Sequence, residues 1–108
     1  MSDDLTDDLV AVIKKHCVDE PIVESATVRF ELDERLEERR NHPGIKYNGG
    51  AFRKAEQASC RDGRLQRWKR RVGKGHVGWS PSMSEDPAAY RRAVAWAQRK
   101  GWTPDEPA

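Results

Sequence analysis

The stretch "RLQRWKRRVGKGHVGW" (residues 64–79) decides how the rest of the chain is interpreted. It is rich in Lys and Arg, it contains two Trp, and it has no Asp or Glu. Its glycines are concentrated towards its end, where they disfavour a helix. The stretch therefore predicts a basic helix over about residues 63–72, followed by a glycine-rich turn or hairpin over residues 73–81.

A helix over residues 63–72 would be amphipathic, because Leu65, Trp68 and Val72 would share one inward face. Trp68 is thus assigned to the core, whereas Trp79 is left open between a core position and a base-stacking platform. The arginines would lie on the opposite side of the helix: Arg64, Arg67, Arg70 and Arg71. Like charges three or four positions apart repel one another on a helix, and these pairs together cost roughly 1 kcal/mol. We therefore expect negative charge from outside this helix to neutralise them.

Charge is unevenly distributed along the chain, although the net charge is only +2. Residues 1–40 contain twelve Asp or Glu and six Lys or Arg. Residues 41–82, in contrast, contain only two Asp or Glu and ten Lys or Arg. Such an asymmetry is typical of a polyanion site, of an acidic protein partner, or of a match between segments of one chain. The internal candidate is "ELDERLEE" (residues 31–38), but it contains Arg35 and has too few acids to offset the basic surplus. We therefore favour an external polyanion.

A nucleic-acid backbone fits the basic segment, since the arginine fork matches phosphate oxygens and binding releases condensed counterions. Two short helices, over about residues 51–60 and 63–72, followed by a glycine-rich wing, have the outline of a helix-turn-helix, although their spacing departs from the standard pattern. The sequence thus predicts a small, non-enzymatic regulatory protein that binds nucleic acid, with DNA favoured. The residues expected to contact the nucleic acid are Arg53, Lys54, Arg61, Arg64, Gln66, Arg67, Arg70, Arg71, Lys74 and His76.

A protein-interaction module is the alternative function. The acidic first third and the basic middle of the chain would then bind oppositely charged patches, so the association would be sensitive to salt. Such a module, of the phage or accessory type, would modulate a larger host or partner protein. The expected partner of the basic middle is an acidic protein surface, and the same charge pattern is compatible with a homodimer.

The helices at the two ends of the chain have clear signals. The stripe formed by Leu5, Leu9, Val12 and Ile13 predicts an N-terminal helix that ends near His16. A final helix is expected from a Ser84 cap to Lys100, with Gly101 in the left-handed position after it. Between them, "ATVRFEL" (residues 26–32) alternates like a half-buried strand and leads into a short helix. A single helix that begins at Pro21 is the competing interpretation.

The expected fold class is mainly α, with about four helices in one small domain. Its minor β element consists of the short strand and the glycine-rich hairpin or wing. Residues 1–103 are predicted to form the domain and residues 104–108 a C-terminal tail.

No catalytic signature occurs in the sequence, and the only enzyme hypothesis kept is a small RNase with His42 and His76 as acid and base. The His and Cys residues lack the C-x₂-C and H-x₃₋₅-H spacings of zinc sites, so neither a metal nor a cofactor is expected. Two Cys are too few for a disulfide framework, and we expect free thiols.

The sequence also bears on compartment. No apolar run reaches the roughly 18–20 residues that span a bilayer, and the N-terminus is acidic where a secretory signal is basic. We therefore expect a cytoplasmic protein without a membrane partner.

Overall fold

The fold is mixed α/β, with helices packed on both sides of an antiparallel sheet. The structure, a computed structural model, describes residues 3–70 and 76–105. Within these ranges the strands form one four-stranded sheet with the order β1-β3-β2-β4, in which every pair is antiparallel. The elements are α1 (Asp3–His16), β1 (Val23–Glu24), α2 (Ser25–Arg40), α3 (Gly49–Arg61), β2 (Leu65–Arg70), β3 (Val77–Pro81), α4 (Pro87–Lys100) and β4 (Trp102–Pro104). The expected mainly α class is therefore wrong, because the sheet is larger than a minor β element.

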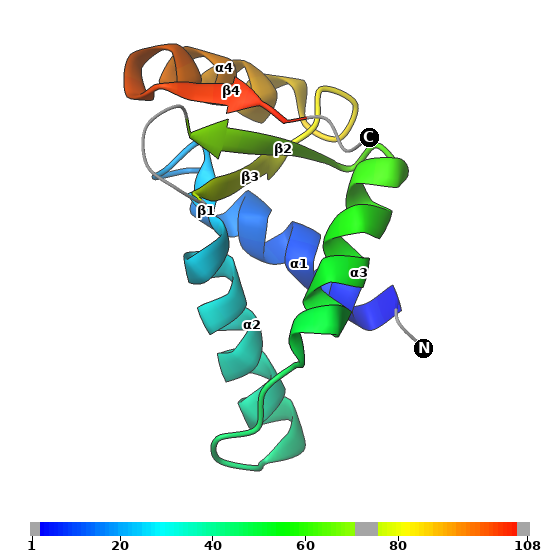
Figure 1. Cartoon of the computed structure of the whole chain (residues 1–108). Helices are drawn as coiled ribbons and strands as arrows, with labels where there is room; N and C mark the ends of the chain where they lie inside the picture. Colours follow the sequence, from blue (N-terminus) through cyan, green and yellow to red (C-terminus); the bar gives the residue numbers. More distant parts are fainter. Residues whose placement is uncertain (1–2, 71–75, 106–108) are drawn as a thin grey trace.

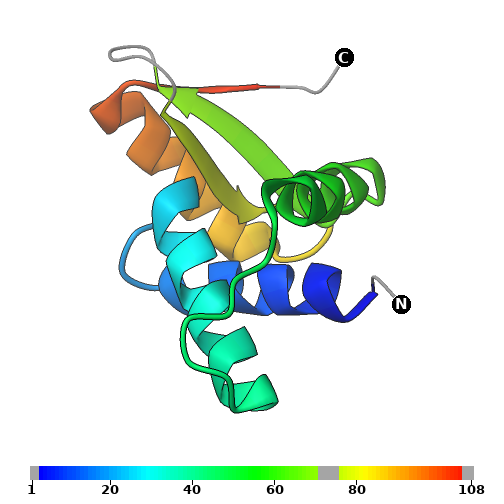
Figure 2. The same ribbon diagram turned by 60° about the horizontal axis from the view of Figure 1, so that its bottom comes forward.

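Three layers follow from this topology (Figure 1). Helix α4 packs against β3 and β4 on one face of the sheet, while α1, α2 and α3 lie on the other side. Helix α1 runs across the space between α2 and α3 and packs against both, as the second view also shows (Figure 2). Helices α2 and α3 consequently stand apart on either side of α1, below the β2–β3 hairpin (Figure 1).

The helix expected over residues 63–72 is wrong, because residues 65–70 form strand β2. Its residues pair with β3 on one side and with β4 on the other, so two ladders of backbone hydrogen bonds replace the helical ones. Alternation along a strand places Arg67 and Trp68 on opposite faces of the sheet. The repulsion expected between arginines on a single helical face is thereby avoided. The expected positions of Arg71, Val72 and Lys74 lie outside the described residues.

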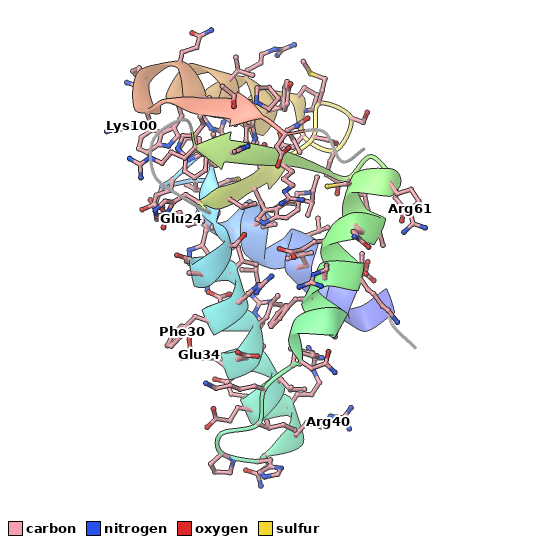
Figure 3. All side chains as sticks on the ribbon, viewed as in Figure 1. Glu24, Phe30, Glu34, Arg40, Arg61 and Lys100 are labelled. Atoms are coloured by element: carbon pink, nitrogen blue, oxygen red, sulfur yellow. The ribbon has the colours of Figure 1, made fainter. Side chains whose placement is uncertain are left out.

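The short strand expected over residues 26–32 is also wrong, since these residues belong to the single helix α2. Val28, Leu32 and Leu36 are buried at intervals of four residues, which is the spacing of one helical face. Phe30, which completed the apparent alternation, is 68% exposed and lies on the outer side of α2 (Figure 3). Helical periodicity therefore decides this segment. The competing interpretation of one helix is right for residues 25–40, but the helix begins at Ser25 and not at Pro21, because Val23 and Glu24 form β1.

The other three helices are confirmed, with one change of cap. Asn48 caps α3 by accepting a hydrogen bond from the N–H of Ala51, at 2.7 Å. Helix α4 is capped by Asp86, which accepts from the N–H of Ala89, rather than by Ser84. Gly101 has φ 79° and ends α4 in the left-handed conformation, as expected. The chain then continues as β4, which ends at Pro104, and the N–H of the next residue, Asp105, donates to the carbonyl oxygen of Arg67.

The sheet separates two apolar clusters. The larger one joins α1, α2 and α3 to the sheet and includes Leu65 and Trp79. The smaller one lies under α4 and contains Ile22, Trp68 and Trp102. None of the helices in the described parts of the chain is long and apolar enough to cross a membrane.

Candidate anion-binding pocket

A pocket of about 440 Å³ lies between α2, α3 and the β2–β3 hairpin. Three elements that are distant in the sequence contribute side chains to it: the first turns of α2, one side of α3, and the face of the hairpin opposite α4. The lining residues are Ser25, Arg29, Arg53, Glu56, Gln57, Cys60, Arg67, Val77 and Trp79.

Helix α3 forms one wall of the pocket because its residues divide between two faces. Phe52, Ala55 and Ser59 are buried and hold the helix against the core. The neighbouring face, at the same helical intervals, supplies the polar wall. It consists of Arg53, Glu56, Gln57 and Cys60.

The hairpin supplies the base of the pocket. Arg67 and Trp79 are directly opposite each other in the β2–β3 register, so both side chains lie on the same face. The Arg67 guanidinium carbon is 6.0 Å from the centroid of the Trp79 ring. The Trp79 indole N–H donates to Ser25 Oγ at 2.8 Å, and only 2% of Trp79 is exposed. Trp79 is therefore a core residue and not an open stacking platform.

The pocket carries more positive than negative charge. Of the described residues that line it, three are arginines and one, Glu56, is a carboxylate. Glu56 Oε1 pairs with Arg29 at 3.3 Å, and the Arg29 guanidinium lies 5.2 Å from the centroid of the Phe52 ring. Arg53 forms no ion pair with any carboxylate in the described parts of the chain.

Arg67 is only partly satisfied. Its Nε lies 3.2 Å from Asp105 Oδ2, close enough for an ion pair. The geometry of this contact does not make a hydrogen bond, however, so the buried Nε–H has no acceptor among the described residues. A buried donor without an acceptor costs about 1–3 kcal/mol, and the charge of Asp105 offsets part of that cost.

The structure brings only part of the predicted contact set together. Arg53 and Arg67 line the pocket. Lys54 lies beside Arg53 but is exposed, and Arg61 points outward from the end of α3 (Figure 3). His76 is exposed and precedes β3.

Other residues of the predicted set lie elsewhere. Arg64 Nη1 pairs with Asp7 Oδ1 at 2.8 Å, and Gln66 Nε2 donates to the carbonyl oxygen of Arg67. Arg70 lies on the opposite face of the sheet, where its guanidinium is 5.8 Å from the centroid of the Trp102 ring. Arg71 and Lys74 lie outside the described residues. The single arginine face expected from a helix over residues 63–72 therefore does not exist.

Only Arg53 and Arg67 of the lining residues belong to the predicted contact set, and both contributors from α2, Ser25 and Arg29, were missed. These two residues lie in the acidic first third of the chain, whose composition does not indicate a basic site. The interpretation of residues 21–40 as one helix would have placed them on a single face, four positions apart. Lys69 was also missed. It pairs with Val77 in the hairpin register, on the same face as Arg67.

Part of the basic surplus is neutralised within the chain, but mainly by residues other than the acidic segment 31–38. Asp7 and Asp8 of α1 pair with Arg64 and Arg39. Glu31 forms a network with Lys15, His16 and Arg35 at 3.2, 2.6 and 3.0 Å. These contacts hold α1 against its neighbours and leave the pocket arginines outside the network.

Both cysteines, Cys17 and Cys60, are free thiols. Burial raises the pKa of the Cys17 thiol, with a smaller opposing effect from Arg92, while Cys60 lines the pocket. His42 follows the end of α2 and His76 precedes the start of β3, and these two places lie apart in Figure 1, so the two imidazoles do not form an acid–base pair in this structure. Across residues 3–70 and 76–105, no three His, Cys, Asp or Glu side chains gather as metal ligands would.

Comparison with known proteins gives no relative: no protein-family model, curated protein or solved structure matches the chain.

Proposed function

We propose that this protein binds the backbone of single-stranded nucleic acid across the surface that contains the pocket. The observation that supports this proposal is the convergence of Arg29, Arg53 and Arg67, from three separate elements, on one pocket with a single carboxylate. We call the surface the cationic face and define it by Arg29, Arg53, Arg67 and Lys69. Arginine forks bind phosphate oxygens in pairs, and neutralised phosphates release counterions.

A single strand fits this face better than a duplex. The basic helix that would have entered a major groove is strand β2, which is paired on both sides within the sheet. The pocket is recessed between α2, α3 and the hairpin, and its volume suits one small group rather than a double helix. Because Trp79 is buried, the face offers phosphate contacts and no base stacking, which favours binding without sequence preference.

The test is a fluorescence anisotropy titration of a labelled single strand and of the matching duplex, at about 50 and 200 mM salt. With four phosphate contacts, affinity for the single strand should fall by about 50-fold between the two salt concentrations. The double variant Arg53→Gln/Lys69→Gln should bind more weakly, and its salt slope should be smaller by about 0.7 per cation removed.

The matched control is Arg91→Gln. Arg91 is exposed on α4, on the other side of the sheet, and has no ion pair with the described residues. This variant should retain wild-type affinity. If no strand binds at the lower salt, or if Arg91→Gln weakens binding as much as the double variant, the proposal is wrong.

A protein-interaction module is the second candidate function. It is favoured by the end of α2, where Glu34, Glu37 and Glu38 lie together and form no ion pair with the described residues (Figure 3). A basic partner would be bound there. Capture from a nuclease-treated lysate tests this function, with the variant Glu34→Gln/Glu37→Gln/Glu38→Gln as the control. A partner retained equally by both proteins would argue against it.

A further inference from the structure

We propose that the pocket binds a phosphate monoester, and that the group it takes is the phosphorylated end of the bound strand. This inference rests on the proposed function, since the cationic face would hold the strand while the pocket recognises its end. The chemical class of the ligand follows from the size, the charge and the donors of the pocket.

Size restricts the occupant to one terminal group. A volume of about 440 Å³ lies in the lower part of the range for small-molecule sites. Side chains from α2, α3 and the hairpin border this volume, which is open to solvent on its remaining side. A strand that continues in both directions needs an open groove, whereas a strand that ends in the pocket needs only one entrance.

Charge favours a monoester over a diester. Around the pocket, the four cations of the cationic face are opposed by two carboxylates, Glu56 and Asp105, a formal excess of two positive charges among the described residues. A terminal phosphate carries about −1.5 to −2 at neutral pH and has three strong acceptor oxygens. A backbone diester carries a single negative charge and would leave half of this excess unmatched.

The donors in the pocket match these acceptor oxygens. Arg67 lines the pocket, and although its buried Nε faces Asp105 Oδ2 at 3.2 Å, its terminal N–H groups make no hydrogen bond with the described residues. Ser25 Oγ accepts the hydrogen bond from Trp79, so its own hydroxyl hydrogen can donate into the pocket that it lines. Arg53 also lines the pocket and has no carboxylate partner among the described residues. Three elements thus contribute hydrogen-bond donors to one pocket.

Base recognition is disfavoured by the same geometry. The aromatic residue in the pocket, Trp79, is 2% exposed, and its indole N–H is already bonded to Ser25. A base would therefore find no aromatic surface on which to stack in this pocket. The phosphate is the group that the pocket is equipped to hold, whatever base follows it.

The experiment compares three single strands of one sequence, each with the label at an internal position. One carries a 5′-phosphate, one a 3′-phosphate, and one has hydroxyl groups at both ends. We expect one phosphorylated strand to bind at least about tenfold more tightly than the hydroxyl strand. The phosphorylated strand that binds more tightly identifies which end enters the pocket. Inorganic phosphate should reduce the affinity of that strand to the affinity of the hydroxyl strand, and should leave the affinity of the hydroxyl strand unchanged.

Two neighbouring residues on α3 provide the variant and its control. Arg53→Gln should abolish the difference between phosphorylated and hydroxyl strands, because it removes a pocket guanidinium that supports no other contact. Lys54→Gln makes the same charge change one position away, at an exposed residue that does not line the pocket. It should leave the ratio of the two affinities unchanged. Identical far-UV circular dichroism of both variants shows that the fold is retained.

The outcomes separate the two proposals. Equal affinity for all three strands overturns the end-binding inference and leaves the proposed function standing. Failure of every strand to bind at about 50 mM salt overturns the proposed function itself. A phosphoserine peptide that binds as tightly as the phosphorylated strand overturns the assignment of the pocket to nucleic-acid ends.

Discussion

The two faces of the β2–β3 hairpin differ in how completely they are closed. On the face covered by α4, Trp68 is almost fully buried and its indole N–H donates to the buried Ser80 Oγ at 2.9 Å. On the opposite face, Arg67 remains partly exposed beside a pocket and its Nε–H lacks an acceptor among the described residues. Residues adjacent in the sequence thus have opposite surroundings.

Because of this difference, we expect the face of the hairpin under α4 to determine stability and the opposite face to determine ligand binding. Substitutions on the face under α4 disturb close packing and satisfied hydrogen bonds, so they should lower the free energy of unfolding. Substitutions in the pocket change charge at partly exposed positions, where ion pairs contribute little to stability. They should change ligand affinity instead. The predictions below test this division, beginning with the largest expected effect.

Gly78→Ala should be the most destabilising of these changes. A Cβ at this position would lie 2.4 Å from Ile22 Cγ2 and 3.1 Å from the Trp102 ring, both on the closed face. Ile22 is buried and branched at Cβ, so it cannot easily move aside. We expect a loss of about 2–3 kcal/mol in the free energy of unfolding, measured by urea denaturation.

Gly49→Ala is the matched control for this substitution. Gly49 lies in the first turn of α3, and nothing is within 4 Å of a Cβ built there. Alanine should leave stability unchanged or raise it by up to about 1 kcal/mol. Similar losses in both variants would mean that the closed face is not tightly packed at Gly78.

Ser80→Ala should cost about 1–3 kcal/mol, because it leaves the buried indole N–H of Trp68 without its acceptor. The comparison is Ser84→Ala, at an exposed serine that makes no hydrogen bond with the described residues. Its effect on the urea midpoint should be negligible, since Asp86 is the cap of α4. Equal midpoints for Ser80→Ala and the wild type would contradict the assigned hydrogen bond.

The helices were largely predictable from sequence because their signals are local. The stripe of Leu5, Leu9, Val12 and Ile13 lies within a few turns, and Gly101 ends α4 immediately after its last residue. The alternation of Val28, Phe30 and Leu32 misled because an exposed phenylalanine counts as apolar in any pattern. Only the packing of this segment against α1 shows that its apolar residues follow the helical period and not the alternation of a strand.

Strand β2 was missed because its signals are not local. Arg64, Arg67 and Arg70 recur every third residue, as on a helical face, while the strand is held by β3 on one side and by β4 on the other. Trp102, which pairs with Arg70, is 32 residues further along the chain. Composition alone placed Arg53 and Arg67 in the predicted contact set, and both line the pocket, whereas Arg29 joins them only through the tertiary fold.

Glu31→Gln should destabilise the protein by about 1 kcal/mol at neutral pH, by weakening the network that joins α1 to α2. Burial raises the pKa of Glu31, but hydrogen bonds from His16 and Lys15 and their positive charges lower it by more, so its pKa in the folded state is depressed. The stabilisation is therefore fully present above the ordinary glutamate pKa of about 4.3 and is lost as the pH falls through the lower folded value.

Urea denaturation at a series of pH values tests this dependence. The difference in stability between the wild type and Glu31→Gln should shrink as the pH falls below about 4.3. Glu34→Gln, three positions further along α2 and without an ion pair to the described residues, should show no such difference. A gap between wild type and Glu31→Gln that is constant with pH would contradict the depressed pKa.

The smallest effect on stability should come from the pocket, with Glu56→Gln. Its partner Arg29 is 44% exposed and also rests on the Phe52 ring, so losing the ion pair should cost at most about 0.5 kcal/mol. Affinity for a phosphorylated single strand should nevertheless rise by a few fold, because the carboxylate that opposes the arginines is gone. The adjacent Gln57→Glu adds a carboxylate to the same pocket and should lower affinity for the strand without changing the free energy of unfolding.

If both variants weaken binding, Glu56 acts by positioning Arg29 rather than by its charge. If both instead unfold at lower urea, the open face supports the fold as the closed one does, and the division between the two faces does not hold.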